Sequence, residues 1–150
     1  MDNSQRRPVA TPSYSVPQSG PHQILVCKAC KHHGQTCKPG FRLLKTLRAA
    51  IAAAGLGDEF EVSGTACLAG CVPDHGGPCV LGVRATAKAT WLFGDIDPAQ
   101  PIDDLFEFAR LYALVDDGWL SGKDLPRRLR DTTLARIPSA IIVTRDGAIQ

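Results

Sequence analysis

The chain has 150 residues, of which 44% are hydrophobic and 21% are charged, a composition typical of one ordinary globular domain. Its net charge of +2 is too small to favour nucleic acid as a partner. The sequence has neither the apolar run of a secretory signal nor a stretch long enough to span a membrane. We therefore expect a cytoplasmic protein, in which static disulfides are rare.

Three regions are expected along the chain. Residues 1–20 are rich in Ser, Pro, Gln and Thr and contain few large apolar side chains, which predicts a disordered tail. Residues 21–138 contain the periodic segments and form the predicted domain. Residues 139–150 make up a C-terminal tail of weakly determined structure, although residues 140–143 have the composition of a further strand.

The first half of the domain predicts a β-α-β unit. Residues 22–27 form a short β-prone run that ends at a cysteine, and the polar residues 28–40 indicate a loop. Apolar residues then recur at helical spacing over residues 41–54, with Pro39 suited to the first turn. The predicted apolar face of this helix consists of Phe41, Leu44, Leu47, Ile51 and Ala54. Alternation over residues 59–64 predicts the second strand.

The second half of the domain predicts a β-hairpin followed by a helix. The two strands are residues 79–84 and 88–93, and residues 94–98 form a turn. Pro101 opens the helix. Its predicted buried stripe consists of Ile102, Leu105, Phe106, Ala109 and Tyr112. Residues 123–136 are expected to be helical in part. This order predicts a thioredoxin-like α/β (α+β) domain, with two main helices packed on a mixed four-stranded sheet.

All six cysteines fall between residues 27 and 79. They form two groups, one before and one after the first predicted helix: Cys27, Cys30 and Cys37, then Cys67, Cys71 and Cys79. Because a β-α-β unit places the ends of its two strands side by side, we expect both groups to converge at one edge of the domain. Thiols gathered in this way bind a metal or an iron–sulfur cluster, cycle as a dithiol and disulfide, or form static cross-links.

The cysteine spacing resembles that of the thioredoxin-like 2Fe-2S ferredoxins. Their ligands follow a cysteine, about ten residues, a second cysteine, about thirty residues and then C-x-x-x-C, a Cys₄ set of the usual kind. Intervals of 9, 29 and 3 residues separate Cys27, Cys37, Cys67 and Cys71. The resemblance covers about residues 22–95. It implies that these four cysteines hold a 2Fe-2S cluster in an electron-transfer or sensing protein that meets a protein redox partner.

A second resemblance covers nearly the whole domain. The motifs that carry it are Val-Cys-x-x-Cys at 26–30, Cys-Leu-Ala-Gly-Cys at 67–71, Leu-Phe-Gly-Asp-Ile-Asp-Pro at 92–98, Gly118-Trp119, and Ala-Arg-Ile-Pro at 135–138. They are similar to a family of uncharacterised bacterial proteins described as predicted metal-binding proteins in the thioredoxin-like group. That family emphasises Cys30 where the ferredoxin pattern uses Cys37, so both stay candidates for the fourth ligand. Cys79 is either part of the site or a small buried hydrophobe.

Other uses of the thiols stay open. Zinc or cobalt bound by thiolates would make the chain an accessory or carrier protein of a metalloenzyme pathway, with Cys27-x-x-Cys30 as one half-site and His33 or His75 as alternative ligands. A thiol–disulfide oxidoreductase would use the same C-x-x-C. The predicted loop after Cys30, however, removes the helix N-terminus that activates the thiolate in such enzymes. A Rieske centre fits poorly because Cys71 and His75 are one residue too far apart.

Four basic residues follow helical spacing on the first predicted helix: Lys38, Arg42, Lys45 and Arg48. A solvated face is the simpler explanation, and the functional one is that they surround an anionic thiolate–iron site and help dock an acidic redox partner. The histidines are expected in solvent-facing loops and the aspartates at turns and helix ends. The sequence has neither a serine-nucleophile motif nor a phosphate loop, so we expect metal binding without catalytic residues rather than an enzyme.

Overall fold

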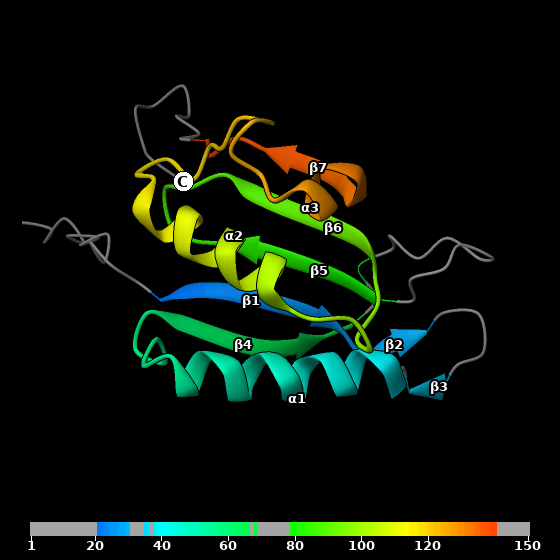
Figure 1. The fold of residues 1–150 in the computed structure, drawn as a ribbon. Helices are drawn as coiled ribbons and strands as arrows, with labels where there is room; N and C mark the ends of the chain where they lie inside the picture. Colours follow the sequence, from blue (N-terminus) through cyan, green and yellow to red (C-terminus); the bar gives the residue numbers. More distant parts are fainter. Residues whose placement is uncertain (1–20, 31–34, 37, 67, 69–78, 141–150) are drawn as a thin grey trace, which may run out of the picture.

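The computed structural model describes residues 21–30, 35–36, 38–66, 68 and 79–140, so the two predicted tails fall wholly or largely outside the described residues. Figure 1 shows the arrangement of the elements. In chain order they are β1 (His22–Cys27), β2 (Ala29–Cys30), β3 (Gln35–Thr36), α1 (Lys38–Ala53), β4 (Phe60–Thr65), β5 (Cys79–Arg84), β6 (Thr90–Ile96), α2 (Asp103–Leu114), α3 (Arg127–Thr132) and β7 (Thr133–Ile137). None of the described helices has the length and apolar composition needed to cross a membrane.

A mixed sheet of five strands lies at the centre, in the order β4-β1-β5-β6-β7 (Figure 1). β1 and β4 are parallel, and the other neighbouring strands are antiparallel. The parallel pair is connected through α1, so the first half of the domain is the predicted β-α-β unit. The predicted α+β class and the thioredoxin-like order of the first four sheet strands are confirmed. The sheet has five strands rather than the predicted four, because β7 pairs with β6.

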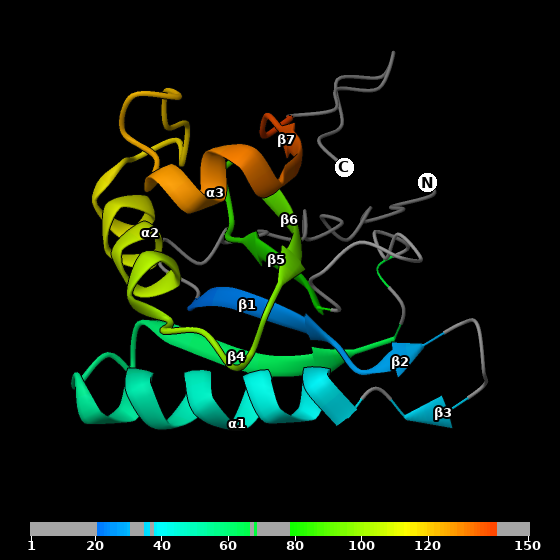
Figure 2. The same ribbon diagram turned by 45° about the vertical axis from the view of Figure 1, so that its right-hand side comes forward.

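The core lies on one face of this sheet. Because side chains alternate along a strand, the paired residues Ile24, Val62, Val83 and Trp91 share a face across four strands. The buried side chains of both long helices join the same core cluster: Leu43, Leu44, Leu47 and Ile51 from α1, and Leu105, Phe108, Ala109 and Tyr112 from α2. Figure 2 shows α1 running along β4 and α2 near the beginning of β1.

An aromatic group fills the part of the core beneath α2. The Trp91 ring stacks on Phe93 and meets the edge of Phe108, with centroid distances of 5.8 and 5.4 Å. The Trp91 indole N–H donates to the carbonyl oxygen of Gly118 at 2.9 Å. The Tyr112 hydroxyl donates to the carbonyl oxygen of Ala89 at 2.7 Å. Both buried polar groups therefore have partners, which removes the cost of burying them unpaired.

The Tyr112→Phe variant is expected to unfold about 1–2 kcal/mol more easily, because the buried Ala89 carbonyl loses its donor. Burial raises the pKa of Tyr112 above its ordinary value of about 10. Its hydroxyl therefore contributes stability below pH 10 that is lost as the pH rises through the folded-state pKa. The difference in free energy of unfolding between wild type and variant should shrink above pH 10 in urea titrations. A difference that grows with pH would contradict this assignment.

The neighbouring Lys88 also makes the stability of the wild type depend on pH, so the effect of Tyr112 is measured as a difference from the Tyr112→Phe variant. Its ammonium donates to the carbonyl oxygens of Tyr112 at 2.8 Å and Ala113 at 3.1 Å, at the C-terminal end of α2. Burial lowers the pKa of Lys88, while the nearby Asp116 and Asp117 act to raise it. Stability therefore rises with pH between its folded and unfolded values, opposite in sign to the tyrosine effect. Lys88 is present in both proteins, so the difference between them reports mainly on the Tyr112 hydroxyl.

The first half departs from the sequence predictions between its first strand and its helix. The predicted loop over residues 28–40 contains the β2–β3 pair, and α1 begins at Lys38 rather than at residue 41. Pro39 lies in the first turn, as expected. The predicted apolar face of α1 is wrong at its two ends, because Phe41 is 46% exposed and Ala54 follows the helix, while Leu43 is fully buried.

The second half contains two further corrections. β6 continues to Ile96 through the predicted turn at 94–98, since a register shift after Leu92 and a positive φ of 50° at Asp95 bend the strand without ending it. In α2, Phe108 rather than Phe106 is fully buried.

The expectation that residues 123–136 are helical in part is confirmed by α3, and the last part of the segment is a strand. α3 ends at Thr132, where two consecutive β-branched residues favour extended backbone. The following residues pair antiparallel with β6, with Trp91 opposite Arg136 and Leu92 opposite Ala135. The Arg136 guanidinium lies between two indole rings, 5.6 Å from Trp91 and 3.6 Å from Trp119. This cation–π contact and the ladder together fix β7 at the edge of the sheet.

Candidate metal centre

The two strands that precede the cysteine groups end side by side. β1 and β4 are parallel with Cys27 opposite Thr65, and the amide of Lys28 donates to the carbonyl oxygen of Thr65 at 3.0 Å. β4 therefore ends beside Cys27 and two residues before Cys67 in the sequence. The expected convergence of the two strand ends at one edge of the sheet is confirmed by this register.

Three other elements meet the same edge. β5 runs antiparallel to β1 and begins there with Cys79. The β2–β3 pair follows β1 directly and contains Cys30, which pairs with Gln35. α1 begins at Lys38, one residue after Cys37 in the sequence. In Figures 1 and 2 the β2–β3 pair and the first turn of α1 lie at the end of the molecule where β1 and β4 stop.

The structure places some of the predicted ligands and leaves others out. Cys27 closes β1 with 1% of its surface exposed, and the backbone of Cys30 lies in β2. The predicted ligands Cys37, Cys67 and Cys71 lie outside the described residues, as do the alternative ligands His33 and His75. Within the part of the chain that is described, no cluster of three or more metal-binding side chains occurs. Three of the five predicted ligands are outside that part, so the site stays a prediction.

Cys27 and Cys79 lie on opposite faces of the sheet. Ile24 and Val26 belong to the core on the helix side, so alternation directs Cys27 to the other face. Cys79 is 0% exposed and is itself part of the core cluster, paired with Ile96 of β6. The position of Cys79 therefore favours a packing role for its side chain.

A positive charge that the sequence reasoning did not single out lies at this edge. The aliphatic carbons of Lys28 occupy the space where Gly64 would carry a side chain. Its ammonium lies 5.8 Å from the centre of the Phe41 ring at the start of α1. Lys28 thus connects the ends of both strands with the first turn of the helix. The sequence contains one local indication that Lys28 lies at this edge, namely that it directly follows a cysteine at the end of a predicted strand.

His22 differs from its prediction as a solvent-facing loop residue. It lies in β1, with its ring stacked on Phe60 at 5.0 Å and against the edge of Tyr112 at 5.7 Å. Its Nδ1 is 3.1 Å from the carbonyl oxygen of Glu59. At about 3.3 Å per residue, five residues of strand put it about 16 Å from Cys27. His22 is therefore no ligand of the candidate centre.

The aspartates expected at turns and helix ends lie there, except Asp95, which lies within β6. The Asp97 carboxylate accepts from the amide of Ala99 at 2.8 Å, and that of Asp117 accepts from the amide of Trp119 at 2.9 Å. Asp103 and Asp104 occupy the first turn of α2, where negative charge favours the helix dipole. These contacts give the aspartates structural roles at turns and at the start of a helix.

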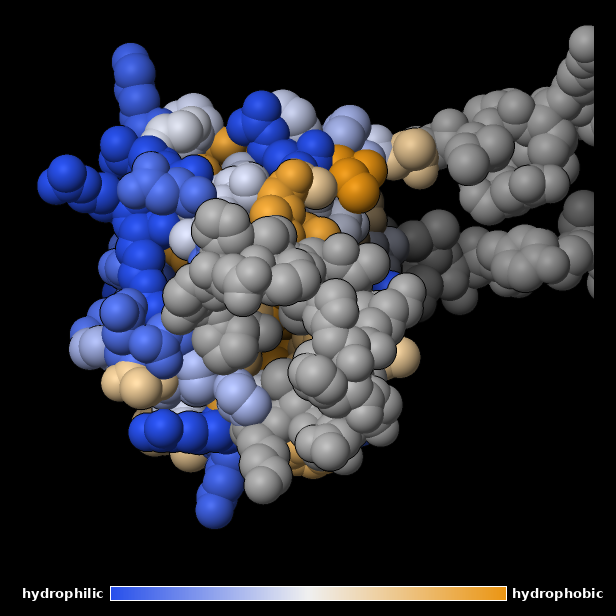
Figure 3. Space-filling model, turned by 90° about the vertical axis from the view of Figure 1, so that its right-hand side faces the viewer, coloured by the Kyte–Doolittle hydropathy of each residue, from blue (hydrophilic) through white to orange (hydrophobic). Residues whose placement is uncertain are grey.

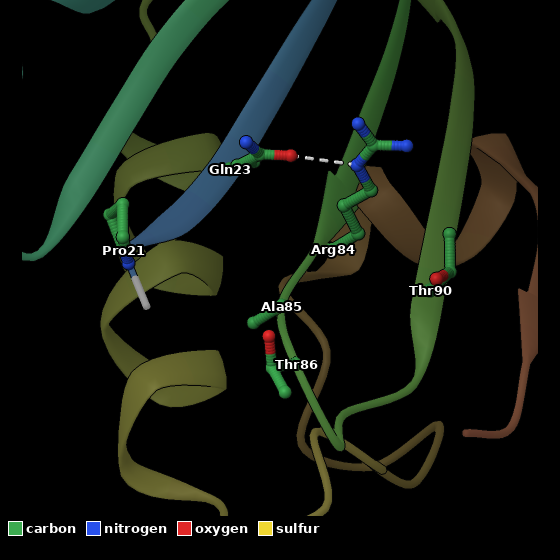
Figure 4. Close-up of a pocket in the computed structure, with 6 residues that line it drawn as sticks. All are labelled: Pro21, Gln23, Arg84, Ala85, Thr86 and Thr90. Atoms are coloured by element: carbon green, nitrogen blue, oxygen red, sulfur yellow. Dashed lines mark hydrogen bonds between the residues drawn. The ribbon is translucent and has the colours of Figure 1, made fainter. Parts of the chain in front are cut away.

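One open pocket lies at the opposite end of the sheet (Figure 4). It has a volume of about 380 Å³ and is lined by Pro21, Gln23, Arg84, Ala85, Thr86 and Thr90. The Arg84 Nε donates to the Gln23 side-chain oxygen at 2.8 Å, as Figure 4 shows. Neither cysteine nor histidine is among these lining residues. The pocket is therefore separate from the predicted metal site.

The fold and this edge define a small thioredoxin-like α/β domain with cysteines where its parallel strands end. A protein-family model described as "Protein of unknown function (DUF1636)" matches residues 24–139. The chain belongs to this family. No curated protein and no solved structure shows a significant match. The predicted membership of an uncharacterised family is confirmed. The description of this family names no metal, so the proposal of a metal centre depends on the residues of the chain.

Proposed function

We propose that this protein binds a metal centre through cysteine thiolates at the edge where β1 and β4 end. The pairing of Cys27 with Thr65 is the observation that carries this proposal. Thr65 ends β4 two residues before Cys67, so the pairing brings the chain that leads to Cys67 beside Cys27, which is 40 positions earlier than Cys67. The centre we favour is a 2Fe-2S cluster bound by Cys27, Cys37, Cys67 and Cys71. The protein would act in electron transfer or in sensing.

The local residues fit a thiolate-bound centre. Cysteine thiolates are the normal ligands of a 2Fe-2S cluster, which supplies the electron-transfer chemistry when bound. Four thiolates bring negative charge, and the edge has compensating positive charge in Lys28 and in the first turn of α1, which has no acidic residue. The near-complete burial of Cys27 keeps water from this ligand. The residues around the strand ends would therefore hold, shield and orient the centre.

The metal itself can be identified on protein purified without oxygen. We expect a coloured protein with charge-transfer bands in the visible range and equal amounts of iron and acid-labile sulfide. A colourless protein with one zinc per chain and no sulfide would reject the cluster and favour the second candidate, a zinc- or cobalt-binding accessory or carrier protein. Cys27 and Cys30 at one edge are the observation that favours this second candidate.

The fourth ligand is tested by two single substitutions. Cys37 directly precedes α1, whose N-terminus stabilises negative charge, whereas Cys30 is three residues from Cys27 in the β2–β3 pair. We expect Cys37→Ser to lower the cluster content more than about tenfold, and Cys30→Ser to leave it within about twofold of wild type. Iron, sulfide and visible absorption measure both. Loss with Cys30→Ser and retention with Cys37→Ser would reverse the assignment.

A thiol–disulfide oxidoreductase is less well supported by the fold. In such enzymes the C-x-x-C motif meets a helix N-terminus that stabilises the thiolate. Here α1 begins eight residues after Cys30, and the β2–β3 pair intervenes. Reduction of a model disulfide that disappears with Cys27→Ser would support this reading instead.

A further inference from the structure

Helix α1 carries charge of only one sign. Between Lys38 and Ala53 it contains four basic residues and no acidic residue. The whole chain is nearly balanced, with 17 Lys and Arg against 15 Asp and Glu. The charge of α1 is therefore a local concentration and not a reflection of a basic chain.

The exposed side of α1, which carries Arg42, Lys45 and Arg48, also exposes an aromatic ring. Phe41 is 46% exposed, although its helical neighbours Leu43 and Leu44 are buried. A shallow hollow of about 480 Å³ runs along this face, lined among the described residues by Phe41, Arg42, Leu44, Lys45 and Arg48. The arrangement places an apolar contact point beside the cations Arg42, Lys45 and Arg48.

Two of the cations on this face are held in place by contacts other than ion pairs. The Arg48 Nε donates to the carbonyl oxygen of Val62 at 2.9 Å, and the Lys28 ammonium lies over the Phe41 ring. Among the described residues the salt bridge present is Arg110–Glu107, on α2. No described carboxylate therefore pairs with the cations of α1 or with Lys28. In Figure 3, hydrophilic residues project from the lower rim of the molecule, the side on which α1 lies in Figure 1.

We propose that this face docks an acidic protein surface. The basic α1 surface consists of Lys28, Phe41, Arg42, Lys45 and Arg48. The inference rests on the proposed function in one respect: the partner is the protein that exchanges electrons with the centre at the adjoining strand ends. Lys28 belongs to both, since it follows Cys27 and contacts Phe41. A partner seated on this surface would therefore lie next to the ends of β1 and β4.

The chemistry of the surface favours an acidic protein over other anions. Cations around one exposed aromatic ring match carboxylates around an apolar side chain, the usual mixture of a transient protein interface. A nucleic acid partner would require a larger net positive charge than +2. A membrane-binding helix needs a wide apolar face toward the lipid, whereas the apolar face of α1 is buried in the core.

Binding of a designed probe tests the inference. The probe is a fluorescent helical peptide in which glutamates surround a central leucine, measured by anisotropy against the full chain. The double variant Arg42→Gln/Lys45→Gln is expected to weaken binding about tenfold, and Phe41→Ala about threefold without any change of charge. The matched control Lys123→Gln/Arg127→Gln removes two exposed charges elsewhere and should change the dissociation constant less than about twofold.

Three outcomes would overturn the docking surface: equal weakening by both double variants, no effect of Phe41→Ala, or tighter binding to anionic lipid vesicles or to a DNA duplex than to the peptide. Thermal unfolding checks that each variant is folded. Metal content is measured on the same samples. Absent metal with intact peptide binding would contradict the proposed function alone, and bound metal with unselective peptide binding would contradict the docking inference alone.

Discussion

Replacing Cys67 by serine is expected to lower bound metal more than about tenfold, because a serine hydroxyl stays protonated near neutral pH and is a poor substitute for a thiolate. Cys67 is the first cysteine after β4, two residues beyond the end of the strand that pairs with Cys27. The loss should occur whether the metal is iron or zinc. Metal analysis of wild type and variant, purified side by side without oxygen, measures it.

Cys79→Ala provides the matched control for this loss. Cys79 lies at the same edge, but its side chain is 0% exposed and belongs to the core. We expect this variant to keep its metal while the free energy of unfolding falls by about 1 kcal/mol, the cost of a small cavity. Metal retained with Cys67→Ser and lost with Cys79→Ala would mean that the ligands lie on the helix side of the sheet.

Replacing Gly118 by alanine is expected to lower the free energy of unfolding by about 2–4 kcal/mol. Gly118 has a φ of +65°, a conformation that costs an L-residue about 1 kcal/mol or more. An added Cβ would lie 2.7 Å from Tyr112 Cε2, 2.9 Å from Lys88 Cβ and 3.1 Å from the Ala89 amide nitrogen. Relief of these contacts would also disturb the bond from the Trp91 indole to the Gly118 carbonyl.

Gly55→Ala separates backbone strain from crowding. Gly55 has a similar φ of +71°, but an added Cβ there meets no atom within 4 Å. Urea unfolding should show a loss of about 1 kcal/mol at Gly55 and a clearly larger loss at Gly118. Equal losses would show that the neighbours of Gly118 move aside at little cost. The expected result would explain the Gly118-Trp119 motif by packing rather than by metal binding.

The elements predicted best from the sequence were those with strong local signals. β1 and β5 have the predicted limits, because each is a β-prone run between polar or turn-forming residues. The β2–β3 pair was missed, since each of its strands has only two residues. β7 was missed because its pairing with β6, and the position of Arg136 between Trp91 and Trp119, join distant parts of the chain.

In the candidate site too, features with a sequence signal were predicted, and features that depend on contacts between distant residues were not. Convergence of the strand ends followed from the β-α-β order and is seen in the pairing of Cys27 with Thr65. The contact of Lys28 with Phe41 and the exposure of that ring depend on tertiary packing, which no local pattern reveals. The identity of the metal was not predictable from spacing, because four thiolates suit iron–sulfur clusters and zinc alike.

The central claim is that the thiols at this edge hold a metal centre, and native mass spectrometry of protein purified without oxygen tests it most directly. We expect the intact chain to carry the added mass of two iron and two sulfide ions, which is lost when the protein is denatured in acid. Added zinc alone would keep the site and change the metal. A chain without added mass, or one lighter by the hydrogens lost in disulfide formation, would contradict the claim.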